Sequence, residues 1–255
     1  MKNKKRNIII AVCMVLTVLI LMIIDQIIPE KPDYPLAQSI IEPFAKSHGI
    51  KMKEYPDEIK AMLEKNSETE EFVLNYPLKK DSHESFSMEE YKNLSAVPRF
   101  MQWDSRWGYE EYAGSIMGIA GCGPVCLSMV AIYLLNDISL DPLYVARFAE
   151  ENDFATKGNG TKWILMSEGA ELLGLHAEEL PLDKNVITNA LNDKKPIICI
   201  MGAGDFTTTG HYIVLTEYSE EGFSVLDPNS KARSGQKWTY EKLESQIRNI
   251  WAFSV

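Results

Sequence analysis

The chain has 255 residues, 45% of them hydrophobic, so it can bury one sizeable core and still carry appendages. Its formal net charge at pH 7 is −10, from 26 Lys and Arg against 36 Asp and Glu. Binding of nucleic acid requires clustered cations against the phosphates, so this composition argues against a nucleic-acid partner.

The N-terminus combines a basic cluster with an apolar run. Four basic residues lie between Lys2 and Arg6, and the 17 residues from Ile8 to Ile24 contain no charge. As a helix these residues would span roughly 26 Å, close to the thickness of a bilayer's hydrocarbon core. A cleaved signal peptide is the alternative, but no small residues mark a cleavage site after Asp25. We expect residues 1–28 to form an uncleaved single-pass anchor, with the basic end cytoplasmic and the rest of the chain extracellular.

Residues 29–95 are predicted to be a stalk or a small helical cap. Short helices are expected over Leu36 to Ser47 and Pro56 to Lys65, and the second has an apolar stripe at helical spacing. The stretch from Leu78 to Ser95 is polar and shows no clear periodicity, which is typical of a link.

The main domain is predicted over residues 96–255, with most of its helices before its strands. The patterns predict helices over residues 122–135, 141–152, 161–173, 185–193 and 240–248. They predict strands over residues 196–201, 211–218, 223–227 and 250–255, with a hairpin turn at residues 219–222. This order indicates an α+β domain with an antiparallel sheet.

Cys122 lies in the sequence Gly121-Cys122-Gly123-Pro124, directly before an apolar run that ends at Leu135. The glycines allow a sharp turn and a close approach of another chain segment, and proline suits the first turn of a helix. The thiol would then lie at the N-terminus of a buried helix, where the helix dipole favours a thiolate. Cys122 is therefore the candidate nucleophile. The alternative is a small residue at a tight helix entry.

The other cysteines point to packing. Cys122, Cys126 and Cys199 follow the predicted anchor, and an odd number excludes a closed disulfide framework. Cys126 is expected in the core, and Cys199 in a buried strand. A zinc site from these three cysteines and His176 is an alternative, but it lacks a second closely spaced ligand pair. We expect no metal and no organic cofactor.

His211 and Asp227 complete a candidate site. His211 opens one predicted strand after a glycine-rich loop, and Asp227 ends the next strand. In an antiparallel hairpin these two positions lie side by side, so the carboxylate can reach the imidazole. Together with Cys122 they form a predicted Cys-His-Asp triad. The alternatives are a strand-end histidine without a task, an Asp-Pro turn, and Asn229 as the third member.

Three motifs resemble the stand-alone extracellular relatives of the bacteriocin-processing cysteine peptidases, namely residues 121–129, 210–214 and 226–229. The resemblance implies a papain-like peptidase fold over roughly residues 96–255. It places Cys122 as nucleophile, His211 as general base and Asp227 as orienting acid. It also implies an oxyanion-hole glutamine, for which the stretch from Phe100 to Asp104 provides Gln102.

These features predict a membrane-anchored, outward-facing bacterial cysteine peptidase that acts on peptide or protein substrates. Exporter-linked members of the family cleave leader peptides after a Gly-Gly pair, but the chain shows no Walker sequence, which argues against that substrate. Two alternatives stay open. One is an amidase or acyltransferase that uses the same triad on cell-wall peptides, and the other is an inactive binding module.

The anchor can be tested on the mature protein. Because the apolar run lacks a cleavage site, the mature chain should keep its N-terminus and sediment with the membranes. Mass spectrometry of the intact protein measures this terminus. A mature N-terminus near residue 30 would contradict the prediction.

Overall fold

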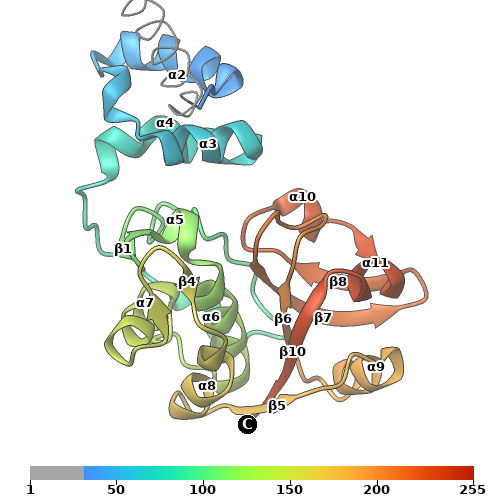
Figure 1. Cartoon of the computed structure of the whole chain (residues 1–255). Coiled ribbons are helices and arrows are strands. Elements are labelled where there is room, and N and C mark those ends of the chain that lie inside the picture. Colours follow the sequence, from blue (N-terminus) through green and yellow to red (C-terminus); the bar gives the residue numbers. More distant parts are fainter. Residues whose placement is uncertain (1–31) are drawn as a thin grey trace, which may run out of the picture. The chain divides into compact units, whose positions relative to one another are not determined.

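Six antiparallel strands form the main sheet of the computed structural model, which describes residues 32–255 (Figure 1). Their order in the sheet is β5-β10-β6-β7-β8-β9. The strands are β5 (His176–Glu179), β6 (Ile197–Met201), β7 (His211–Ser219), β8 (Gly222–Leu226), β9 (Lys237–Trp238) and β10 (Ile247–Ser254). The helices and this sheet confirm the predicted α+β class.

Helices cover both faces of the sheet because its central strand is apolar on both sides. All five residues of β6 are buried. Ile198 and Ile200 belong to the core that contains α6 (Cys122–Leu135), whereas Ile197, Cys199 and Met201 belong to the core that contains α9 (Lys184–Asn192). In α6 every residue from position 123 to 132 is buried, which explains why this run carries no charge.

One of the remaining elements, the helix at residues 35–48, is as long as α6, and the others are shorter. The helices are α2 (Pro35–His48), α3 (Asp57–Lys65), α4 (Glu70–Lys79), α5 (Met117–Ala120), α7 (Pro142–Glu151), α8 (Glu168–Leu172), α10 (Lys231–Ser234) and α11 (Tyr240–Glu244). Two small hairpins pair β1 (Glu111–Tyr112) with β2 (Ser115–Ile116), and β3 (Ala155–Thr156) with β4 (Gly160–Thr161).

Residues 36–255 form one compact unit, and the predicted anchor within residues 1–28 lies outside the described residues. Between residues 32 and 255, none of the helices has the length and apolar character needed to cross a membrane. The predicted stretch 29–95 contains α2, α3 and α4, so its described part is largely helical. The predicted domain boundaries stay predictions.

Two predicted helices were wrong. Residues 161–173 do not form one helix, because β4 ends at Thr161, a 3-10 turn follows, and α8 begins only at Glu168. The backbone breaks at Ser167, whose φ of −113° and ψ of −88° lie outside the helical region. The predicted helix 240–248 stops at Glu244, because Ile247 already pairs with Met201 in the sheet. The sequence patterns also missed α4, α5, α10, β5, β9 and the two small hairpins.

Candidate active site

Cys122 is the first residue of α6, as predicted, and glycines allow the close packing around it. A Cβ atom on Gly121 would lie 2.5 Å from the carbonyl oxygen of Met117, and one on Gly123 would lie 2.5 Å from Oγ1 of Thr161. Neither position therefore has room for a side chain. Cys122 is partly exposed, whereas Cys126 and Cys199 are buried.

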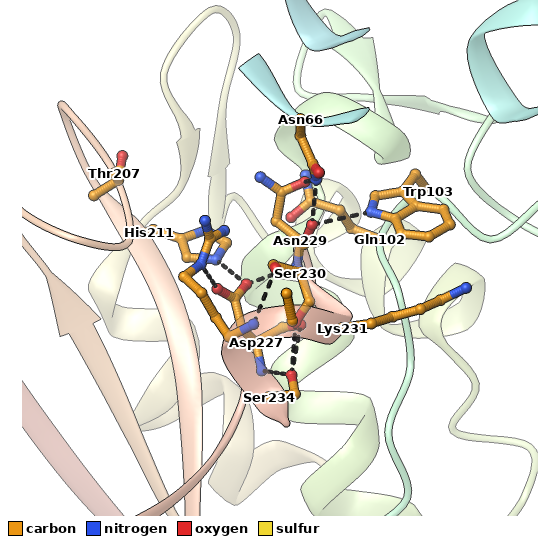
Figure 2. Close-up of polar contacts among 12 residues, drawn as sticks. Asn66, Gln102, Trp103, Thr207, His211, Asp227, Asn229, Ser230, Lys231 and Ser234 are labelled. Atoms are coloured by element: carbon orange, nitrogen blue, oxygen red, sulfur yellow. Dashed lines mark hydrogen bonds and ion pairs between the residues drawn. The ribbon is translucent and has the colours of Figure 1, made fainter. Parts of the chain in front are cut away.

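The predicted contact between the two adjacent strands is present. Nε2 of His211, at the start of β7, lies 2.8 Å from Oδ1 of Asp227, which follows β8 directly (Figure 2). The same carboxylate oxygen accepts a hydrogen bond from the backbone N–H of Asn229 at 2.7 Å. Because an ionised carboxylate can only accept, Nε2 of His211 carries a proton, and Nδ1 is the nitrogen left for the thiol.

Asn229 contacts other partners than the imidazole. Its carbonyl oxygen accepts hydrogen bonds from Nδ2 of Asn66 at 2.6 Å and from Nε1 of Trp103 at 3.2 Å (Figure 2). Its side-chain Oδ1 lies 3.5 Å from the same Asn66 nitrogen. Of the two residues considered as the third member, Asp227 is the one that contacts His211.

A cation pairs with the far side of the buried carboxylate. Nε of Arg233, on α10, donates to Oδ2 of Asp227, whose side chain is fully buried. Burial would raise the pKa of Asp227, but the charges and hydrogen bonds of His211 and Arg233 hold it below its ordinary value. Asp227 therefore stays ionised at neutral pH.

The imidazole and the thiol favour each other's charged forms. Burial would lower the pKa of His211, but the charge of Asp227 and the hydrogen bonds to Asp227 and Cys122 raise it to about 10. Burial would likewise raise the pKa of Cys122. The hydrogen bond and the charge of His211, and then the backbone N–H groups of Tyr212 and Gly123, lower it instead. The arrangement favours a thiolate–imidazolium pair at neutral pH.

Gln102 lies in the same cleft as Cys122 and His211. Its backbone N–H donates to the carbonyl oxygen of Pro228 at 2.7 Å. Its side-chain Nε2 donates to the carbonyl oxygens of Gly118 at 2.8 Å and Ile119 at 3.1 Å, and its buried Oε1 has no partner among the described residues. The amide thus lines the same cleft as the thiol, and its nitrogen is bonded to α5.

The cleft has a volume of about 580 Å³ and runs between three parts of the chain. Cys122 and Gln102 line it together with residues of α5. The loop 204–210 lines one side, and residues of α3 line another. Within residues 32–255, no group of three or more His, Cys, Asp or Glu side chains is arranged to hold a metal ion.

The model of the "Peptidase_C39 like family" matches residues 94–254. The chain belongs to this family. The resemblance to the bacteriocin-processing peptidases is confirmed by this match. The part of the chain that precedes residue 94, including α2, α3 and α4, lies outside it.

Two solved structures are similar to this C39-like protein. The peptidase domain of Streptococcus ComA, described as a bifunctional ABC transporter of a quorum-sensing pathway, is 19% identical, with a TM-score of 0.39 over 53% of this chain and 91% of that one. A protein of Bacillus anthracis, provisionally described as a C39-like peptidase, is 17% identical, with a TM-score of 0.39 over 62% of this chain and 95% of that one. A comparison with curated proteins gave no match.

Sequence reasoning missed three contributors to the site, namely Arg233, Asn66 and Glu68. Arg233 lies six positions after Asp227, but no strand or helix pattern marked α10. Asn66 donates to the carbonyl oxygen of Asn229, and Glu68 accepts from the hydroxyl of Ser230. Each lies more than 160 positions before its partner in the sequence. A charged residue shortly after the Asp-Pro-Asn turn was the available signal, but it fits Lys231 as well as Arg233 and does not distinguish them.

The charge state of the C39-like site can be tested by alkylation. Iodoacetamide should modify Cys122 much faster than Cys126 and Cys199, and this reactivity should persist below pH 7, because its lowered pKa keeps the thiolate populated there. Reactivity should fall only as the pH drops through that lowered pKa. His211→Ala removes the cation that lowers the pKa, so the low-pH reactivity should be lost. Mass spectrometry of the labelled peptides gives the three rates.

The two buried cysteines serve as internal controls in this experiment. If Cys126 and Cys199 stay unreactive in His211→Ala, the variant is folded and the loss at Cys122 reflects its pKa. Slow and equal labelling of all three cysteines, unchanged by His211→Ala, would contradict a thiolate–imidazolium pair.

Proposed function

We propose that this protein is a cysteine peptidase that hydrolyses peptide bonds through Cys122, His211 and Asp227. One observation carries the proposal. The partly exposed thiol at the start of α6 has a lowered pKa beside an imidazole whose other nitrogen is bonded to a buried carboxylate. A nucleophile, a base and an orienting acid in this relation are what acyl transfer to a thiol requires.

In the acylation step, the Cys122 thiolate attacks the carbonyl carbon of the scissile peptide bond, and a C–S bond forms. The carbonyl oxygen becomes an oxyanion, which the backbone N–H of Cys122 and the amide of Gln102 stabilise by hydrogen bonds. Nδ1 of the His211 imidazolium then donates its proton to the leaving nitrogen as the C–N bond breaks. The products are a thioester on Cys122 and a free amine.

In the second step, the neutral imidazole accepts a proton from water while the water oxygen attacks the thioester carbon. The C–S bond breaks, the acid product leaves, and the thiolate–imidazolium pair is restored. Asp227 acts throughout by fixing the ring orientation through Nε2 and by stabilising the imidazolium. Arg233 helps to keep Asp227 ionised by pairing with its second oxygen.

We also propose that residues 1–28 anchor the enzyme in the cell membrane and that the peptidase domain faces outward. The proposal rests on the basic cluster at residues 2–6 and the apolar run that follows it. Peptides and proteins outside the cell would then be its substrates.

The identity of the orienting acid can be tested with two neighbouring variants. Asp227→Asn should leave the fold intact but lower kcat by several orders of magnitude, since the wrong tautomer of His211 is favoured and the imidazolium loses its counter-charge. Asn229→Ala keeps the backbone bonds of the same turn and should have a far smaller effect. Steady-state hydrolysis of a peptide pool measures both. The reverse ranking would make Asn229 the third member.

The role of Gln102 can be tested in the same assay. If its amide turns from the α5 carbonyls toward the oxyanion, Gln102→Ala should lower kcat on the order of 100-fold. The alkylation rate of Cys122 should change little, because alkylation forms no oxyanion. A kcat close to that of the wild type would assign oxyanion binding to backbone N–H groups alone.

A further inference from the structure

One wall of the cleft comes from a helix outside the region that matches the family. Glu58, Ala61, Met62 and Lys65 of α3 line the same cleft as Cys122. Their spacing of three, four and seven positions places them on one face of the helix. Because the family match begins at residue 94, the family does not account for this wall.

The segment directly after the C-terminal end of α3 is hydrogen-bonded to the turn that begins with Asp227. Directly after α3, Asn66 donates to the carbonyl oxygen of Asn229 at 2.6 Å. Glu68 then accepts hydrogen bonds from Oγ of Ser230 at 2.6 Å and from the backbone N–H of Lys231 at 2.7 Å. The contact of Asn66 (Figure 2) and those of Glu68 tie the segment after α3 to the turn that begins with Asp227.

The N-terminal end of α3 is hydrogen-bonded to β2. Oγ of Ser115, in β2, donates to Oε2 of Glu58 at 3.2 Å, and β2 leads directly into α5, which also lines the cleft. The lining face of α3 is therefore held along the length of the cleft, from the Asp227 turn to the segment before Cys122.

The wall has a simple chemical pattern. Glu58 and Lys65 are exposed and of opposite charge, and seven helical positions separate them by about 10 Å. Ala61 and Met62, both half-buried, lie between them. On the other side, the loop carries three consecutive threonines, and its one acid, Asp205, accepts a hydrogen bond from Nε2 of Gln246 at 2.7 Å. Glu58 and Lys65 are thus the two charges that α3 contributes to the cleft.

We propose that α3 is a substrate-binding wall that selects an extended peptide with a basic and an acidic residue four positions apart and an apolar residue midway between them. In an extended strand alternate side chains share a face, and four positions span about 13 Å. Long charged side chains close the small difference from 10 Å. The basic residue would face Glu58, the apolar residue would face Ala61 and Met62, and the acidic residue would face Lys65. This inference rests on the proposed peptidase function.

The test uses the full chain and a library of internally quenched peptides in which the two outer positions are Lys, Glu or Ala, in both orders. The wild type should lose about fivefold in kcat/KM when the acidic residue is replaced by a basic one, as expected for a partly exposed ion pair. Lys65→Glu should reverse that preference, and Glu58→Lys should change the preference at the other charged position only.

Lys60→Glu is the matched control. It makes the same charge change on the same helix, but Lys60 pairs with Asp57 at 3.0 Å and does not line the cleft. It should leave both preferences unchanged. The iodoacetamide rate at Cys122 should equal that of the wild type in all three variants, which shows that the site is intact.

Two outcomes count against the proposals, and they differ. If the wild type cleaves peptides but Lys65→Glu and Glu58→Lys keep its preferences, α3 does not select the substrate and the peptidase function stands. If the wild type cleaves no member of the library and Cys122 labels like an ordinary thiol, the peptidase function itself fails, and this inference fails with it.

Discussion

A buried negative charge organises this molecule. The Asp227 carboxylate has no exposure to solvent, and an uncompensated ion in such a place would cost several kcal/mol. Its compensation comes from an imidazole, a guanidinium and a backbone N–H, one each from His211, Arg233 and Asn229. Each donor requires its own element to be in place, namely the start of β7, the short helix α10 and the turn after β8. The orientation of the His211 imidazole, which faces the thiol, therefore depends on the correct packing of these three elements.

The turn from residue 227 to 230 passes this constraint on to the rest of the chain. Its carbonyl oxygens accept from the backbone of Gln102 and from the side chains of Asn66 and Trp103. The Ser230 hydroxyl donates to Glu68. The turn therefore bonds to the segment before α5, to the loop after α3 and to its own sheet. The α3 side of the cleft and the orienting acid thus belong to one hydrogen-bonded structure.

The sequence alone was sufficient for the parts of the site that local pattern determines. Cys122 was found because glycines and proline mark the start of an apolar helix, and the pair His211 and Asp227 because hairpin register brings the two positions together. The prediction of a helix over residues 161–173 was wrong. The apolar residues there follow helical spacing, but the backbone leaves the helical conformation at Ser167. Glu68 could not be found, because its partners lie far along the chain and no periodicity links them. The amide orientation of Gln102 is likewise set by α5 carbonyls that a motif does not describe.

The hydrogen bonds of Asn66 and Glu68 also limit where a boundary of the peptidase domain can be placed in this chain. A boundary drawn at residue 94, where the family match begins, would leave the Asn229 carbonyl oxygen and the Ser230 hydroxyl without these partners. It would also remove Phe72, whose ring stacks on Tyr109 at 4.2 Å and whose carbonyl oxygen accepts from the same tyrosine. A swap of peptidase domains between relatives would meet the same difficulty. The unit that recombination can exchange is therefore longer than the unit that sequence comparison defines.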